Sequence, residues 1–141
     1  MFFNQTEDDV AILNIENKDV MNELKKRGYK LGILTNKPQE TTESVCEKYL
    51  LDVGFDAIKG ARSGVKIKPD PEALFMMLNE LDVQPENAYF VGDGETDAMI
   101  ALNAGAKGIS VLWGYRTKEE LTAAGATTFA EKPLDLLNII R

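Results

Sequence analysis

Hydrophobic and polar residues follow a helical spacing in several stretches of this chain. Between residues 18 and 27, Val20 and Leu24 fall on one face, Asn17 is placed to cap the start, and Gly28 suits the position after a helix. The pattern therefore predicts an amphipathic helix here.

A similar pattern follows Asp70-Pro71, which has the form of an N-cap and a first helical residue. Leu74, Leu78 and Leu81 then lie at positions i, i+4 and i+7, on one helical face. Thr117 and Glu120 have the spacing of a capping box. Further helices are predicted at residues 39–50, 97–103, 117–124 and 134–140.

Short apolar runs between these stretches predict strands at residues 30–34, 57–60, 88–91, 108–112 and 128–130. Strands that alternate with helices imply an α/β fold, with a doubly wound parallel sheet covered on both faces. No repeat or linker is evident, so residues 1–141 are interpreted as one domain. Ligands bind beyond the carboxyl ends of such strands, where Thr35-Asn36 and Asp93 should share one edge.

The composition excludes several classes of binding and catalytic site. The 141 residues include 16 Lys plus Arg and 23 Asp plus Glu, and the net charge of −7 argues against nucleic-acid binding. With no histidine, Ser-His-Asp and Cys-His catalysis are excluded. The single Cys46 cannot form an internal disulfide, so a reducing cytoplasm is the expected location. No signal peptide or membrane span is predicted.

The most informative stretch is Gly92–Asp97, which follows an apolar run and opens a helix. Asp93 and Asp97 are hard oxygen ligands, and Mg²⁺ is typically held by one or two carboxylates plus a substrate phosphate. The alternative is a polar turn in which Asp97 favours a helix N-terminus. A dinucleotide fingerprint would need Gly or Ala at Asp97, and an EF-hand fails at Ala98 and Ala104.

Two further residues suit an anion. Thr35 offers a hydroxyl and a backbone amide where a helix is predicted to begin, although a simple turn or capping role is the alternative. Pro69 holds Lys68 extended, which would aim a fixed positive charge at a phosphate. An ordinary solvated lysine is the alternative for Lys68.

Together these residues resemble the haloacid dehalogenase superfamily of phosphotransferases, especially its phosphoglycolate phosphatase and pyrophosphatase-like branch. The matching segments are Leu31–Pro38, Lys68–Pro71 and Phe90–Asp97, in the family's order, with Trp113–Tyr115 as further support. The resemblance covers residues from about Asn17 onward. It implies a Rossmann-like core and Mg²⁺-dependent hydrolysis of a small phosphorylated molecule.

The resemblance also implies a role for each matching residue. Thr35 corresponds to the hydroxyl that binds the transferring phosphoryl group, with Asn36 beside it. Lys68 corresponds to the lysine that steadies the nucleophile and the phosphate charge. Asp93 corresponds to the magnesium ligand, and Asp97 to a second acid that completes the ion's shell or orients Lys68.

The family's first motif, an Asp-x-Asp pair after the first core strand, has no match before Thr35. The best positional candidate is Val10–Glu16, with Asn14 and Glu16 where the two aspartates would be. A neutral amide cannot act as the carboxylate nucleophile. Residues 1–16 are therefore interpreted as a cap remnant or a replacement strand, with the family's first strand and cap missing or replaced.

In the family the missing strand lies between the strands that end at Thr35 and Asp93, so its loss would leave unpaired backbone groups inside the sheet. One hypothesis is that residues Val10–Ile15 fill the gap. Another is that two copies exchange segments or pair edges as a homodimer. A missing partner fragment is the third.

We therefore expect a phosphatase core that is inactive or nearly so by itself. The rival interpretation is a non-catalytic module, a truncated pseudo-phosphatase that binds phosphate or a protein partner. A receiver-like signalling domain is less favoured, because no phospho-accepting aspartate follows an apolar strand near the middle of the chain.

Overall fold

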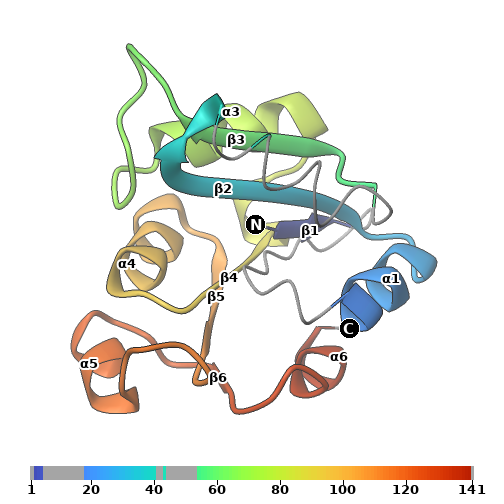
Figure 1. Cartoon of the computed structure of the whole chain (residues 1–141), viewed down its shortest axis with the longest axis vertical. Coiled ribbons are helices and arrows are strands. Elements are labelled where there is room, and N and C mark those ends of the chain that lie inside the picture. Colours follow the sequence, from blue (N-terminus) through green and yellow to red (C-terminus); the bar gives the residue numbers. More distant parts are fainter. Residues whose placement is uncertain (1, 5–17, 41–42, 44–53, 141) are drawn as a thin grey trace.

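The computed structural model describes residues 2–4, 18–40, 43 and 54–140 (Figure 1). Six strands form one sheet in the order β3-β2-β1-β4-β5-β6, and every neighbouring pair is parallel except the two pairs that include β1. The predicted α/β class is thereby confirmed, and the sheet that was predicted to be parallel is parallel except at β1. The strands are β1 (Phe2–Asn4), β2 (Lys30–Pro38), β3 (Ala57–Ala61), β4 (Tyr89–Gly92), β5 (Lys107–Val111) and β6 (Phe129–Ala130).

Helices cover both faces of the sheet, as the doubly wound fold requires. Helices α4 and α5 contact each other, as do α1 and α6, and Figure 1 shows the two pairs on opposite sides of the sheet. None of the helices in the described part of the chain has the length and apolar character that crossing a bilayer requires. The helices are α1 (Lys18–Lys26), α3 (Glu72–Leu81), the short 3₁₀ helix η2 (Pro85–Asn87), α4 (Glu95–Ala104), α5 (Lys118–Ala123) and α6 (Asp135–Ile139).

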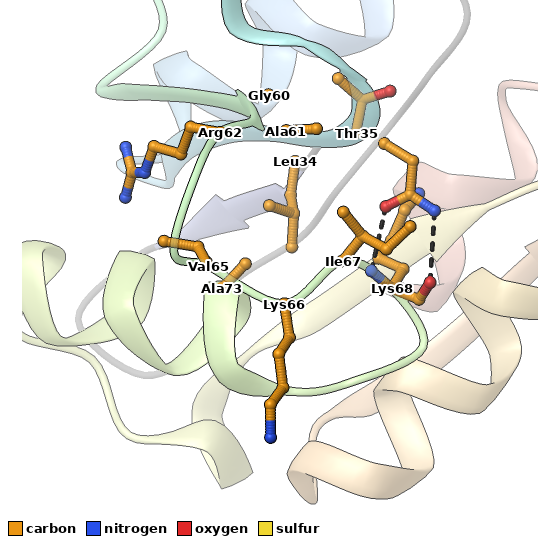
Figure 2. Close-up of a pocket in the computed structure, with 11 residues that line it drawn as sticks. Leu34, Thr35, Gly60, Ala61, Arg62, Val65, Lys66, Ile67, Lys68 and Ala73 are labelled. Atoms are coloured by element: carbon orange, nitrogen blue, oxygen red, sulfur yellow. Dashed lines mark hydrogen bonds between the residues drawn. The ribbon is translucent and has the colours of Figure 1, made fainter.

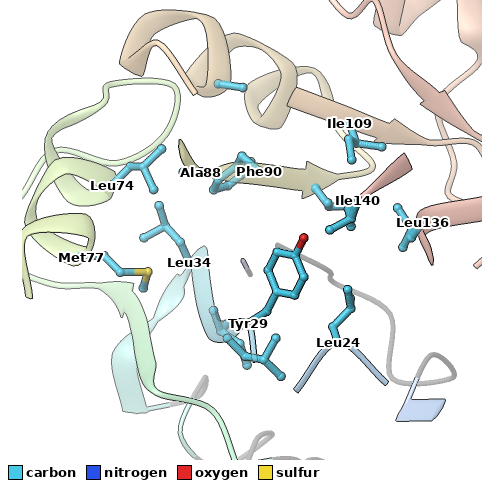
Figure 3. Close-up of a cluster of buried hydrophobic side chains, with 14 of the residues drawn as sticks. Leu24, Tyr29, Leu34, Leu74, Met77, Ala88, Phe90, Ile109, Leu136 and Ile140 are labelled. Carbon is cyan, nitrogen blue, oxygen red and sulfur yellow. The ribbon is translucent and has the colours of Figure 1, made fainter. Parts of the chain in front are cut away.

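The apolar faces predicted from the sequence supply the core. Val20 and Leu24 of α1 are both buried, and the chain leaves this helix through Gly28 at φ 95°, a conformation that glycine adopts without a Cβ penalty. Leu24 packs in the cluster that Figure 3 shows, together with Tyr29, Phe90 and other side chains from the sheet. Leu74, Leu78 and Leu81 of α3 are buried as their spacing predicts.

Two helix starts were predicted from capping residues, with different outcomes. Helix α3 begins at Glu72 with Pro71 as its N-cap, so Asp70 is one residue too early for the predicted role. The Asp70 carboxylate still accepts a hydrogen bond from the Glu72 N–H at 2.9 Å, because aspartate readily bonds the backbone two residues on. At α5, Thr117 and Glu120 form the predicted capping box.

Strand β2 runs to Pro38 rather than ending at Leu34 as predicted. Its register with β3 shifts between Leu34, which pairs with Lys59, and Pro38, which pairs with Ala61. Four steps on β2 thus match two on β3, so residues 35–37 form an irregularity of the bulge type. Residues 39, 40 and 43 are helical, and the rest of the helix predicted to Leu50 lies outside the described residues.

The place between β2 and β4 is occupied by β1, which runs antiparallel to both neighbours. Phe2 pairs with Gly32 on one side and with Phe90 on the other, and Asn4 pairs with Lys30. The hypothesis that Val10–Ile15 fill this place falls on residues outside those described. The central position is therefore supplied by a strand of reversed direction, which β2 and β4 hydrogen-bond from both sides.

Candidate functional site

Lys68 lies at the carboxyl edge of the sheet, in the segment between β3 and α3. Only 7% of its side chain is exposed, and its Nζ lies 2.5 Å from Oδ1 of Asp97, which is 5% exposed. A lysine is almost never buried to this degree unless it is paired. The structure therefore excludes the ordinary solvated lysine as an account of Lys68.

Asp97 is fixed in turn by the start of α4. Its second oxygen, Oδ2, accepts a hydrogen bond from the Gly94 N–H at 3.1 Å. A Cβ at Gly92 would lie 2.3 Å from Asp97 Cγ, so the absence of a side chain at Gly92 leaves the room that this carboxylate fills. The glycine-rich turn after β4 thus places Asp97 against Lys68.

Asn36 connects the end of β2 to the same lysine. Its Oδ1 accepts a hydrogen bond from the Lys68 N–H at 2.9 Å, and its Nδ2 donates to the Lys68 carbonyl at 3.3 Å (dashed lines in Figure 2). Thr35, half-buried in the irregular part of β2, lines a small crevice together with Lys68. Thr35, Asn36 and Lys68 are therefore neighbours at one edge, as the topology predicts.

Asp93 follows β4 directly and is half-buried. A Cβ at Gly114 would lie 2.7 Å from Asp93 Cβ and 2.8 Å from its Oδ2, so the backbone after β5 packs closely against this side chain. Since Asp93 immediately precedes Gly94, which bonds Asp97, it belongs to the same edge as Lys68. The structure thus brings the three predicted motifs together.

The observed positions bear differently on the phosphate-binding and metal-binding roles that were predicted for these residues. Of the two roles considered for Asp97, the geometry matches the orientation of Lys68, while its part in holding a metal stays a prediction. The phosphate-binding roles of Thr35, Asn36 and Lys68 and the metal role of Asp93 also stay predictions. The Asn36 side chain uses its carbonyl oxygen and one of its two Nδ2 hydrogens on Lys68, which leaves one Nδ2 hydrogen for another acceptor.

Mg²⁺ takes oxygen ligands in near-octahedral geometry and keeps several waters. Asp93 makes no hydrogen bond or ion pair with the other described residues, whereas both oxygens of Asp97 are engaged. No group of three or more His, Cys, Asp or Glu side chains gathers within the described ranges. The residues fit an ion held by Asp93 and completed by phosphate and water.

Sequence reasoning missed two residues that shape this edge. Asn103, in the last turn of α4, donates from Nδ2 to the Pro69 carbonyl at 2.9 Å. Gly114 makes the close approach to Asp93. The Trp113–Tyr115 segment carried a family resemblance but no assigned role, and nothing in the spacing of Asn103 indicated a distant backbone partner.

The fold and the residues at its carboxyl edge define a doubly wound α/β core with a buried Lys–Asp pair and an acidic turn after a central strand. The family of haloacid dehalogenase-like hydrolases matches this chain over residues 5–111, and the chain belongs to that family. Among curated proteins it is 37% identical over 122 residues to pyrophosphatase PpaX from Bacillus cereus strain G9842, covering 86% of this chain and 56% of the relative. PpaX from Bacillus mycoides strain KBAB4 is 36% identical, with 86% and 57% covered.

Solved structures agree. A candidate phosphoglycolate phosphatase from Lactobacillus delbrueckii subsp. bulgaricus superposes with a TM-score of 0.82 at 31% identity, covering 87% of this chain and 51% of that one. A predicted phosphatase from Clostridium acetobutylicum gives 0.79 at 27% identity, with 94% and 60% covered. The chain thus falls in the phosphatase branch of its superfamily and spans a little over half the length of the curated relatives it matches.

Proposed function

We propose that this edge of the sheet binds the phosphoryl group of a small cytoplasmic phosphate compound together with Mg²⁺, as part of a phosphatase site. The buried, oriented ammonium of Lys68 carries this proposal, because a fixed cation in a low-dielectric setting stabilises phosphoryl charge strongly. Thr35 would donate its hydroxyl to a phosphoryl oxygen, and Asp93 would hold the ion. When bound, Mg²⁺ neutralises charge on the phosphoryl oxygens.

The same proposal includes a negative expectation, that this chain alone hydrolyses phosphate esters little or not at all. No Asp-x-Asp pair precedes Thr35, and attack on phosphorus in the family requires the first of those carboxylates. Strand β1 runs antiparallel, so the end of β1 that faces the site edge is its first residue, Phe2, where a parallel strand would place its last residues.

The direction of β1 favours a second candidate, a non-catalytic module that binds phosphate or a protein partner. A parallel strand would present its last residues to Lys68, whereas β1 presents its first. Phosphate binding without turnover is common to both candidates, and stable binding of a protein partner would distinguish the module. Exchange of β1 between two copies, or pairing of sheet edges, stays a proposal of the same kind, and light scattering tests it.

The first test measures anion binding. Isothermal titration of the purified chain with tungstate, a phosphate mimic, in the presence of Mg²⁺ should give saturable binding. Asp93→Asn should weaken it because the carboxylate is lost while the shape is kept, and Asn79→Ala, at an exposed position on α3, should not. Equal affinity of parent and Asp93→Asn would contradict the metal-linked site.

The second test measures turnover. Pyrophosphate, phosphoglycolate and an aryl phosphate are incubated with the same protein and Mg²⁺, and released phosphate is measured. We expect no release above buffer. Robust Mg²⁺-dependent release that is lost in Asp93→Ala would show that the chain is a complete enzyme and that the proposed inactivity is wrong.

A further inference from the structure

Two asparagine side chains hold the backbone of the Lys68-Pro69 dipeptide from opposite sides. Asn36, from the irregular part of β2, bonds both the N–H and the carbonyl of Lys68, at 2.9 and 3.3 Å. Asn103, from the last turn of α4, donates to the Pro69 carbonyl at 2.9 Å. Since proline has no N–H, these bonds satisfy every backbone hydrogen-bonding group of the dipeptide.

The Lys68 side chain is held at its other end by the same helix. Asp97 lies in the first turn of α4 and pairs with Nζ, while Asn103 lies in the last turn and bonds the backbone. Lys68-Pro69 is therefore bonded to the first and the last turn of α4, and Asn36 bonds Lys68 to β2. The long, flexible Lys68 side chain is thereby held at its ammonium group by Asp97, and its backbone is held by Asn36.

This attachment matters because the pairing of β1 with β2 and β4 does not extend to the carboxyl edge of the sheet, where Lys68 lies. Strand β1 pairs with Lys30–Gly32 of β2 and with Tyr89 and Phe90 of β4. Toward the carboxyl edge, the hydrogen bonds of Asn36 and Asn103 and the Lys68–Asp97 ion pair link β2 to α4 through Lys68-Pro69. Both asparagines thus bond the backbone of the segment that carries the ammonium.

We propose that Asn36 and Asn103 are positioning residues that together fix the Lys68 ammonium at the anion site. In this arrangement Asn36 affects a bound anion through Lys68 and not through its own side chain. The inference rests on the proposed function for the anion, but the fixing of the ammonium is independent of it.

The first test observes the ammonium directly, without any ligand. In ¹⁵N NMR spectra of lysine ammonium groups, the buried Lys68 group should exchange slowly with water, and its signal should be absent in Lys68→Ala. Asn36→Ala and Asn103→Ala should each speed exchange or shift the signal, while Asn79→Ala leaves it unchanged. Thermal unfolding of each variant verifies that it is folded. An unchanged ammonium signal in both Asn36→Ala and Asn103→Ala would overturn the proposal.

The second test is a double-mutant cycle on tungstate affinity in the presence of Mg²⁺. Asn36→Ala should weaken binding roughly fivefold to tenfold in the parent, as the loss of two hydrogen bonds suggests, and should have no effect in Lys68→Ala. An equal loss in both backgrounds would mean that Asn36 contacts the anion itself and would overturn its assigned role. If the parent binds no tungstate, the proposed function fails and the ammonium spectra alone decide the positioning role.

Discussion

The Lys68 ammonium and the Asp97 carboxylate form an ion pair 2.5 Å apart, and both side chains are more than nine-tenths buried. A second pair, between Arg116 and Glu95 at 2.7 Å, has side chains 49% and 46% exposed. The two pairs differ mainly in their access to water. One molecule thus contains a buried pair and a matched exposed pair that both involve α4.

Breaking the buried pair should cost far more stability than breaking the exposed one. Asp97→Asn leaves the Lys68 charge buried and uncompensated, which typically costs about 3–5 kcal/mol of unfolding free energy, whereas Glu95→Gln should cost about 1 kcal/mol or less. Adding Lys68→Met to Asp97→Asn should recover part of the loss, because no unpaired charge remains. Urea unfolding measures all three; equal losses for Asp97→Asn and Glu95→Gln would contradict the burial argument.

Gly92 should tolerate no side chain. An alanine Cβ there would lie 2.3 Å from Asp97 Cγ, so the carboxylate must move away from Lys68. We expect Gly92→Ala to lower the unfolding free energy by about 1–3 kcal/mol or more. Gly94→Ala is the matched control, since its Cβ would meet Asp97 Oδ2 at an ordinary 3.5 Å. Similar unfolding midpoints for the two variants would argue against a steric requirement at Gly92.

Gly114 should affect ligand binding more than stability. A Cβ at this position would approach Asp93 Oδ2 to 2.8 Å and displace the carboxylate proposed to hold the ion. Gly114→Ala should therefore weaken tungstate binding in the presence of Mg²⁺. Tyr115→Ala, at a neighbouring side chain that is 97% exposed, serves as the control for the loop. Unchanged affinity in Gly114→Ala would separate this loop from the site.

The capping box of α5 should make stability depend on pH in the acid range. The Thr117 backbone N–H, which donates to the Glu120 carboxylate, holds the pKa of Glu120 below its ordinary value, and the Thr117 side chain acts in the same direction. A lowered folded-state pKa means that the ionised group stabilises the fold above the unfolded-state pKa. That contribution is lost as pH falls through the folded-state value.

Glu120→Gln should accordingly be less stable than the parent at neutral pH, and the difference should shrink as the pH falls below the ordinary glutamate range. Chemical denaturation at several pH values measures it. Glu119→Gln, next to the capping box but outside it, should show no comparable pH-dependent difference. A gap between parent and Glu120→Gln that stays constant down to strongly acid pH would contradict the assignment.

Periodicity was sufficient to predict the elements whose apolar faces enter the core. Leu74, Leu78 and Leu81 define α3, and alternation with short apolar runs defines the largely parallel sheet. Topology then predicts that Thr35-Asn36 and Asp93 share an edge. Local patterns predict these elements correctly because the burial of one face determines both the type of element and its orientation.

The features that periodicity missed depend on contacts between distant parts of the chain. The strand Phe2–Asn4 is too short to show a pattern, and its place in the sheet is set by unpaired groups on β2 and β4. The two-residue irregularity that extends β2 to Pro38 depends on register with β3, which no local signal specifies. The sequence presents Asn103 only as a polar residue of a predicted helix. Its partner, the Pro69 carbonyl, is brought beside it by the fold.

The reversed direction of β1 has a practical consequence for anyone who handles this protein. Because Phe2 is registered with Gly32 and Phe90 and β1 is antiparallel to both neighbours, a polypeptide fused ahead of β1 would enter the sheet from the carboxyl edge of β2 and β4. A purification tag placed there would add its own imidazoles to a chain without histidine, beside the proposed anion site. Tags and fluorescent labels therefore belong after α6, where they leave that site as the sequence made it.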